Sequence, residues 1–334
     1  MTKKVFDFFS SFGMMLVGVC LLFVCSVSFY HNSEAKLPKS GERNWLGGDA
    51  EQHIFPVSHP AVPLVQGKSE FTGKLTAASA LVVDDRTDTV LWEKNSEEIR
   101  SLASITKLMS ALVLLDSPIK WATTTEITSE DDLDSSHAIQ AGDKLTAEEL
   151  WHLALVGSSN SAVNALVRIS GWSEDEFVAK MNQKAKNLRL NSLIFSDPTG
   201  LNSGNRGNAR DIIRLLKVAL QQPKISTALQ TSEYYAKPIG AKKQRRVWST
   251  DWLLIGWIPS NFKPAQIAGK TGYIGDSGYN FVVRLEEGEK KAVRVLILGA
   301  ASNETRFTEA RDLGEWAFAN YAWPGDSGYD GLAE

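Results

Sequence analysis

The chain has 334 residues, of which 43% are hydrophobic and 22% charged, and its formal net charge is -3 at pH 7. This hydrophobic fraction is sufficient for a sizeable core. The nearly balanced charge argues against a bulk attraction to nucleic acid. Both cysteines, Cys20 and Cys25, lie close to the N-terminus. The rest of the chain therefore has no disulfide and no cysteine metal ligand.

The N-terminus has the pattern of a segment that enters a membrane. Residues 1–4 are basic and residues 12–29 are nearly all apolar. We expect residues 1–30 to be either a cleaved signal peptide or a retained membrane anchor. The basic side should stay in the cytoplasm, so the remainder of the chain is expected outside it.

Residues 31–72 are polar, contain several prolines and show little periodicity. This composition predicts a linker. After it, residues 79–84 and 90–92 form two hairpin-like apolar runs. A helix is then predicted around Ser104, because apolar residues recur there at helical spacing. They are Leu102, Ile105, Leu108, Met109, Leu112, Val113 and Leu115.

Ser104 and Lys107 combine a hydroxyl nucleophile with a candidate base. Residues three apart share one face of a helix, so Lys107 should reach Ser104 Oγ. A serine hydroxyl needs a base to remove its proton, and a lysine is a base only while it is deprotonated. Burial and a second cation both lower a lysine pKa. The pair therefore predicts Ser104 as nucleophile and Lys107 as general base.

Ser158 and Asn160 form the second candidate motif. Ser158 is suited to relay a proton between Lys107 and the leaving amine, and Asn160 can hydrogen-bond a substrate amide or the lysine itself. His152 lies on a predicted helix over 151–155, where we interpret it as a packing or surface residue.

Lys270, Thr271 and Gly272 form the third motif. Lys270 would supply the second cation and meet the carboxylate of a peptide. Thr271 offers a hydroxyl to that carboxylate, and Gly272 lets a strand edge approach the substrate backbone. The backbone N–H groups of Ser104 and Tyr273 would then form the oxyanion hole.

A serine three residues before a lysine is common, and this chain repeats the spacing at Ser33, Ser117 and Ser260. Taken singly, Ser104 could be a helix cap, Ser158 a turn residue and Lys270 a solvated strand end. Only Ser104 is followed by a Ser-x-Asn string 54 residues later and by a Lys-Thr-Gly string 166 residues later. Their joint occurrence favours an active site.

The three motifs resemble those of the low-molecular-mass penicillin-binding proteins, the D-alanyl-D-alanine carboxypeptidase and endopeptidase family. The similarity extends from about Ala77 to about Ala319. It includes the strings 103–109, 197–201 and 209–211, with Asn208 standing where the family usually has Ser or Thr. That difference puts only a local helix cap in doubt.

The resemblance implies an α+β fold of the β-lactamase/transpeptidase type, in which an antiparallel sheet is flanked by helices and carries a helical subdomain. We expect the serine DD-peptidase domain over 73–322 and a flexible tail over 323–334. After Gly272 the sequence predicts strands at 281–283 and 293–298 and a helix near 309–319. No second β-rich domain is expected there.

The resemblance also implies a function, namely cleavage of peptidoglycan crosslinks as a D-alanyl-D-alanine endopeptidase, with D-alanyl-D-alanine carboxypeptidase as the alternative. The expected partners are peptide stems of peptidoglycan, β-lactams as covalent inhibitors, and the membrane if the N-terminal segment is retained. No cofactor is expected. The expected location is the periplasm or the outer face of the cytoplasmic membrane.

Each of three alternative functions predicts its own pattern in the sequence. A class A β-lactamase shares the motifs but needs a glutamate loop, and residues 192–198 contain none. Trypsin-like chemistry is suggested by Gly-Asp-Ser-Gly at 275–278 and 325–328, yet tyrosine follows both strings and the context of His137 and His152 does not fit. We interpret both strings as tight turns. A catalytically inactive wall-binding protein would have no need for a complete set of motifs.

Metal-dependent hydrolysis is not indicated, because no His-x-x-x-His or His-x-His pair occurs. One dense basic cluster remains outside the motifs, made of Lys242, Lys243, Arg245 and Arg246. It predicts a solvated loop, with contact to an anionic wall or lipid surface as the alternative.

Overall fold

The computed structural model describes residues 61–133, 139–288 and 291–333. The predicted signal peptide or anchor (1–30), most of the predicted linker and His137 lie outside these ranges. Within them, no helix is long and apolar enough to cross a membrane.

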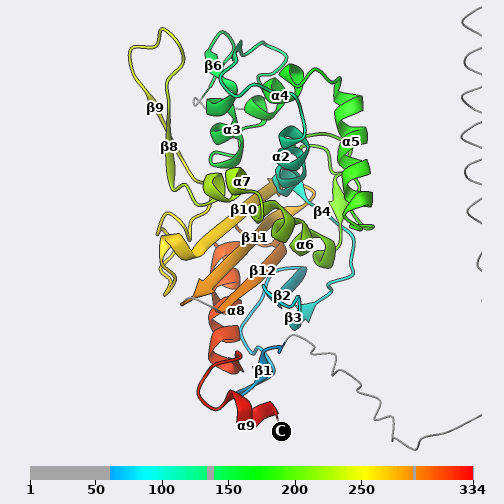
Figure 1. The fold of residues 1–334 in the computed structure, drawn as a ribbon, viewed down its shortest axis with the longest axis vertical. Coiled ribbons are helices and arrows are strands. Elements are labelled where there is room, and N and C mark those ends of the chain that lie inside the picture. Colours follow the sequence, from blue (N-terminus) through cyan, green and yellow to red (C-terminus); the bar gives the residue numbers. More distant parts are fainter. Residues whose placement is uncertain (1–60, 134–138, 289–290, 334) are drawn as a thin grey trace, which may run out of the picture. The chain divides into compact units, whose positions relative to one another are not determined.

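The centre of the fold is a five-stranded antiparallel sheet in the order β10-β11-β12-β2-β3 (Figure 1). Its strands are β2 (Ser79–Asp84), β3 (Val90–Lys94), β10 (Ile267–Ile274), β11 (Gly278–Glu287) and β12 (Lys291–Ala300). The expected strands at 79–84, 281–283 and 293–298 are all present, and the latter two are longer than predicted. The α+β fold class is confirmed.

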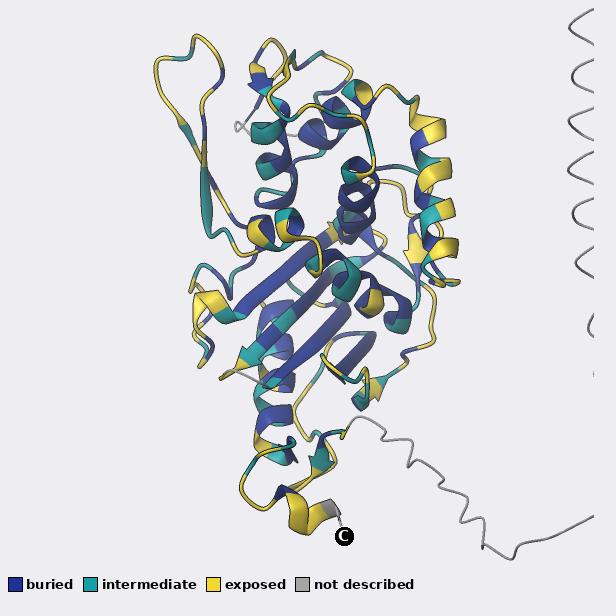
Figure 2. Cartoon of the chain, in the orientation of Figure 1, coloured by how far each residue is buried: buried dark blue, intermediate teal, exposed yellow. Residues whose placement is uncertain are grey.

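The sheet is buried on both faces (Figure 2). Alternate residues of β2 point to opposite sides, so Leu81 and Val83 belong to one core while Ala80 and Val82 belong to the other. Helix α8 (Thr305–Asn320) covers the second side with Phe307 and its neighbours. It was expected over 309–319.

Helices on the other side of the sheet form the subdomain expected from the sequence. A short 3-10 turn η1 (Ala103–Thr106) leads into α2 (Lys107–Leu115), which packs on α4, α5 and α6. The helices are α3 (Ala147–Leu155), α4 (Asn160–Ile169), α5 (Glu174–Asn187), α6 (Ala209–Leu220) and α7 (Pro223–Leu229). Asn208 caps α6 by accepting a hydrogen bond from Asp211 N at 3.0 Å, so the substituted cap is functional.

Short elements complete the described chain. The two-stranded pairs are β1 (Leu64–Val65) with β13 (Tyr321–Ala322), β4 (Arg100–Ser101) with β7 (Arg206–Gly207), β5 (Thr124–Glu126) with β6 (Lys144–Thr146), and β8 (Glu233–Ala236) with β9 (Arg245–Trp248). The turn η2 (Pro264–Gln266) precedes β10, and α9 (Tyr329–Ala333) follows β13.

The structure differs from the expected boundaries at both ends of the domain. Val65, expected in the linker, pairs with Tyr321. Trp323, expected in a flexible tail, is buried and donates from Nε1 to Asp84 Oδ1 at 2.8 Å. Two-residue strands and one buried indole give no periodic signal in a sequence, which is why these contacts were not predicted.

The basic cluster lies in the β8–β9 hairpin rather than in a simple loop. Arg245 Nη2 donates to Asp143 Oδ1 at 2.9 Å, and Arg246 pairs with Glu233 across the hairpin. Lys242 and Lys243 are exposed in the turn between the strands, as predicted.

Candidate active site

Ser104 lies in η1, immediately before α2, and is partly exposed. Lys107, the first residue of α2, is buried, and its Nζ donates to Ser104 Oγ at 2.9 Å. The predicted approach of these two side chains is therefore present. Ala103 has a φ of 48°, a strained value for a residue with a side chain, and strain of this kind concentrates at functional sites.

Lys107 joins three segments of the chain. Besides Ser104, its Nζ donates to Asn160 Oδ1 at 2.7 Å and to the Thr199 carbonyl at 2.7 Å. The sequence predicted the contact with Asn160 as one of two possibilities. The carbonyl of Thr199 was not predicted, because any residue type can supply a backbone acceptor.

The loop at 197–200 is held by Asp197. Its carboxylate accepts hydrogen bonds from Thr199 N at 2.6 Å, Gly200 N at 2.8 Å and Asn202 N at 2.8 Å. Burial alone would raise the pKa of Asp197, but these hydrogen bonds, with that of the Thr199 hydroxyl, outweigh it and lower the pKa. The charge of Asp197 therefore stabilises the loop that carries the Thr199 carbonyl.

Gly200 has a φ of +92°, and a Cβ atom there would lie 2.1 Å from the Ala103 carbonyl oxygen. Only glycine fits this approach of the loop to the peptide that precedes Ser104.

Lys270 is buried in β10 and forms a second lysine–serine contact. Its Nζ donates to Ser158 Oγ at 2.7 Å and to the Thr271 carbonyl at 3.1 Å. Burial lowers the pKa of Lys270 well below its usual value, and the cations of Lys107 and Arg306 add to this effect. The interpretation of Lys270 as a solvated strand end is therefore wrong.

Ser158 has a φ of 60° and precedes Ser159, which caps α4 by accepting from Ala162 N at 3.1 Å. The structure therefore brings the predicted relay hydroxyl directly to Lys270.

Gly272 brings β10 against Ser104. A Cβ atom at this position would lie 2.6 Å from the Leu102 carbonyl oxygen and 3.1 Å from Ser104 N. The sequence suggested that this glycine makes room for substrate, and the structure adds that it makes room for the Ser104 backbone. Buried Arg306, on α8, donates to the Gly272 carbonyl at 3.1 Å and holds the strand there.

Two polar residues beside Lys270 and Thr271 were missed. Thr250 shares a hydrogen bond with Thr271, with 2.6 Å between their hydroxyl oxygens. Asp251 is buried, and burial raises its pKa to about 6 despite hydrogen bonds from the N–H groups of Leu253 and Leu254 and the nearby cations. The sequence around 248–252 carries no motif, so only the tertiary fold reveals this position.

The remaining sequence candidates lie outside this cluster. His152 stacks on Tyr234 with 4.5 Å between ring centroids, and burial lowers its pKa, which agrees with a packing role. The Gly-Asp-Ser-Gly strings at 275–278 and 325–328 lie in turns, as expected. Across the described ranges, no group of three or more His, Cys, Asp or Glu side chains is placed to hold a metal ion.

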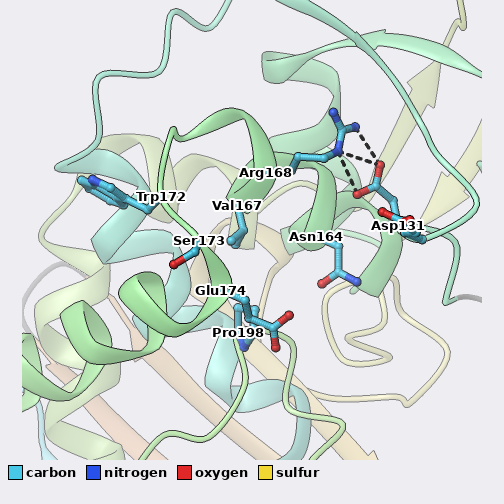
Figure 3. Close-up of a pocket in the computed structure, with 9 residues that line it drawn as sticks. Asp131, Asn164, Val167, Arg168, Trp172, Ser173, Glu174 and Pro198 are labelled. Carbon is cyan, nitrogen blue, oxygen red and sulfur yellow. Dashed lines mark hydrogen bonds and ion pairs between the residues drawn. The ribbon is translucent and has the colours of Figure 1, made fainter.

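A separate pocket of about 280 Å³ lies between the end of α4 and the start of α5 (Figure 3). Arg168 pairs there with Asp131 at 2.7 Å, and its hydrogen bonds help lower the pKa of that carboxyl against the effect of burial. Pro198 also lines the pocket. The pocket thus lies behind the loop that supplies the Thr199 carbonyl, not at Ser104.

A partly exposed serine in contact with a buried lysine, next to a second buried lysine on a strand edge, defines a serine acyltransferase of the Ser–Lys type. The sequence profile of the D-alanyl-D-alanine carboxypeptidase family, peptidase family S11, matches residues 66–302. The chain belongs to this family of serine D-Ala-D-Ala peptidases.

Curated relatives are similar over most of the chain. The D-alanyl-D-alanine endopeptidases of Haemophilus influenzae and Pseudomonas aeruginosa are 32% and 30% identical, over 70% and 73% of this chain and 80% and 77% of theirs. The D-alanyl-D-alanine carboxypeptidase DacF of Bacillus subtilis is 30% identical over 73% of this chain. The matched region spans 63% of the DacF protein.

Solved structures show the same fold. A mutant form of a Streptomyces DD-transpeptidase superposes with a TM-score of 0.67 and 25% identity, covering 74% of this chain and all of that one. A D-alanyl-D-alanine carboxypeptidase from Mycobacterium tuberculosis superposes with a TM-score of 0.64 over 80% of this chain and 96% of its own.

Proposed function

We propose that the protein is a D-alanyl-D-alanine endopeptidase that opens peptide crosslinks in peptidoglycan. The observation that carries the proposal is the contact of Ser104 with buried Lys107 beside the Ser158–Lys270 pair. The endopeptidase relatives support the choice of substrate, because the chain accounts for 80% and 77% of their lengths. Carboxypeptidase activity is the second candidate, favoured by the similarity to DacF.

In the proposed acylation, neutral Lys107 takes the proton of Ser104 as its Oγ forms a bond with the carbonyl carbon of the D-alanine at the scissile bond. The backbone N–H groups of Ser104 and Tyr273 hold the developing oxyanion. When the C–N bond breaks, Ser158 delivers a proton to the leaving amine. Lys270 and Thr271 bind the substrate carboxylate, while Asn160 orients the substrate amide.

A water molecule then cleaves the acyl ester and restores the Ser104 hydroxyl. Penicillin would enter by the same acylation and leave slowly, since residues 192–198 hold no glutamate. Asp197, the acid in this loop, has its carboxylate engaged by the loop's own N–H groups. This arrangement supports slow deacylation and argues against a β-lactamase.

The compartment and domain boundaries belong to the same proposal. We infer export by residues 1–30, action in the periplasm or at the outer face of the cytoplasmic membrane, and a peptidase domain that includes β1 (Leu64–Val65) and the segment after residue 322. The pairing of β1 with β13 supports both wider limits.

The test uses Ser104→Ala and a matched control, Ser260→Ala. Ser260 also precedes a lysine by three residues, yet it lies in the loop before η2. We expect Ser104→Ala to abolish both labelling by fluorescent penicillin and cleavage of crosslinked muropeptide dimers, because the acyl bond cannot form. The control should retain both activities.

The products identify the substrate. Monomers released from dimers support the endopeptidase, whereas D-alanine released only from pentapeptide monomers would replace it with the carboxypeptidase. Unchanged activity of Ser104→Ala would overturn the assignment of the nucleophile, and rapid turnover of a chromogenic cephalosporin would overturn the peptidase.

A further inference from the structure

The β8–β9 hairpin and the segment that follows it carry exposed aromatic side chains beside Arg246. Tyr235, Trp248 and Trp257 are exposed by 46%, 40% and 56%. Arg246 lies over the Trp248 ring, 3.7 Å from its centroid, and 5.8 Å from that of Tyr235. The rings of Trp248 and Trp257 are 6.3 Å apart and inclined at 51°. We call these four residues the hairpin platform.

Strand pairing places most of the platform on one face. Tyr235 is the cross-strand partner of Arg246, and Trp248 lies two residues further along β9, so the three side chains share that face. Val247, between Arg246 and Trp248, is buried on the opposite face. The hairpin projects beside α3 on the side of the sheet edge formed by β10 (Figure 1).

The platform is continuous with the active site. Thr250, two residues after Trp248, shares a hydrogen bond with Thr271, and its N–H donates to the Val156 carbonyl at 3.1 Å. Gly157, the residue after Val156, lies against the hairpin, because a Cβ atom on it would lie 2.5 Å from the Val247 side chain. The platform is therefore joined to Thr271 through Thr250, which lies two residues from Trp248 in the chain.

The chemistry of the platform favours an uncharged ligand with both apolar and polar sides. Arg246 is paired with Glu233, so the charge within the platform itself is balanced, and the exposed Lys242 and Lys243 lie in the turn of the hairpin, outside the four platform residues. Exposed indole faces carry negative partial charge and attract polarised C–H groups. A pyranose ring presents C–H groups on its faces and hydroxyls at its rim, where the Arg246–Glu233 pair can hydrogen-bond them.

The distances fit a sugar attached to the far end of a peptide stem. An extended stem of about four residues spans about 13 Å. The extended chain from Thr250 back to Arg246 covers about the same distance. A stem that runs from Thr271 along the chain segment between Thr250 and Arg246 is therefore long enough to bring its glycan to the platform.

We propose that the hairpin platform binds the sugar rings of the glycan strand and so selects crosslinks that are still attached to glycan. This inference rests on the proposed function, because it takes peptidoglycan as the substrate.

The test compares dimeric muropeptides that carry their disaccharides with the same peptide dimers after removal of the sugars. Trp257→Ala and Trp248→Ala should lower the ratio of kcat/KM for sugar-bearing over sugar-free dimers about three- to tenfold, the range that one aromatic stacking contact supports. Ile239→Ala is the matched control, an exposed apolar side chain in the turn of the same hairpin, and should leave the ratio unchanged. A ratio unaffected by both tryptophan variants would overturn the proposal.

A binding experiment separates this proposal from the proposed function. Glycan chains without stem peptides are titrated against the Ser104→Ala protein with tryptophan fluorescence as readout, and against the same protein carrying Trp257→Ala. Binding that is weakened about three- to tenfold by Trp257→Ala supports the platform even if no dimer is cleaved. Absence of binding by the Ser104→Ala protein would overturn the platform while leaving the peptidase intact.

Discussion

Lys107 lies among hydrogen-bond acceptors from three segments of the chain. Its Nζ is within hydrogen-bond distance of Ser104 Oγ, Asn160 Oδ1 and the Thr199 carbonyl. To act as a base it must lose one proton and turn a lone pair toward Ser104. Lys270 and Arg306 lie in the same buried region and repel added positive charge.

Asp251 is the single residue from which we expect the clearest effect of pH on the stability of the fold. Its pKa is about 6 in the folded protein against an ordinary value of 3.8, so between these values the folded state binds more protons than the unfolded state. Stability from this group is therefore lost as the pH rises from about 4 to about 6. The Asp251→Asn variant has no carboxyl to titrate at this position. The melting temperature of the variant minus that of the wild type should therefore rise from about pH 4 to about pH 6 and then stay constant.

Thermal melts of both proteins from pH 4 to pH 8 check this expectation. Asp197→Asn provides a comparison of opposite sign, because the pKa of Asp197 is lowered and its charge stabilises the fold at neutral pH. This variant should lose stability relative to wild type as the pH rises from about 3 to about 4 and then show a constant difference, so its melts start at about pH 3. A gap between Asp251→Asn and wild type that does not change with pH would show that Asp251 has an ordinary pKa.

At the scale of elements, the site depends on a loop and a strand that both pack closely against η1. Gly200 approaches the Ala103 carbonyl from one side, and Gly272 approaches Leu102 and Ser104 from the other. Ser104 is therefore clamped between a loop and a strand that are distant in sequence.

Gly200→Ala should disrupt this clamp. The alanine would have an unfavourable positive φ, which costs about 1 kcal/mol or more. Its Cβ atom would also clash with the Ala103 carbonyl oxygen at 2.1 Å. We therefore expect at least a tenfold loss in the rate of penicillin acylation. Gly240→Ala separates the two effects, because Gly240 also has a positive φ of +81° but has nothing within 4 Å of an added Cβ. That variant should lose a little stability and keep the acylation rate. Equal rates in the two variants would contradict the clamp.

The sequence predicted those elements whose signals are local. The motif residues Ser104, Lys107 and Asn160 meet because short strings and helical spacing encode them, and the long strands follow from their apolar runs. The β8–β9 hairpin was missed, because Lys242–Arg246 is a basic stretch whose arginines are neutralised by distant acids. Thr250 and Asp251 are significant only through burial beside β10, which no local pattern records.

At the scale of the whole molecule, two cores share one sheet, and the segment after β13 closes the second core. Trp323 packs on Phe318 with 5.3 Å between ring centroids and donates to Asp84. Trp323→Ala should lower the free energy of unfolding by about 3 kcal/mol or more. Trp323→Phe keeps most of the packing and loses the hydrogen bond, for about 1 kcal/mol.

Chemical denaturation measures both losses, with the exposed Trp257→Ala as the control that should cost far less. Because Asp84 lies at the end of the sheet away from Gly272, the folded fraction of Trp323→Ala should acylate penicillin at the wild-type rate. A slower rate in that fraction would mean that the second core positions the nucleophile.

The pairing of β1 with β13 has a consequence for how the chain can be connected. Tyr329 Oη donates to the Val62 carbonyl at 2.7 Å, so the two ends of the described domain are neighbours (Figure 1). A short peptide could join them, with new termini opened in the exposed turn near Gly240. In such a circular permutant Lys270 would precede Ser104 and Ser158 in the chain while every contact of the site was kept. The order of the motifs along the chain, by which relatives are recognised, is thus not required by the chemistry of the site.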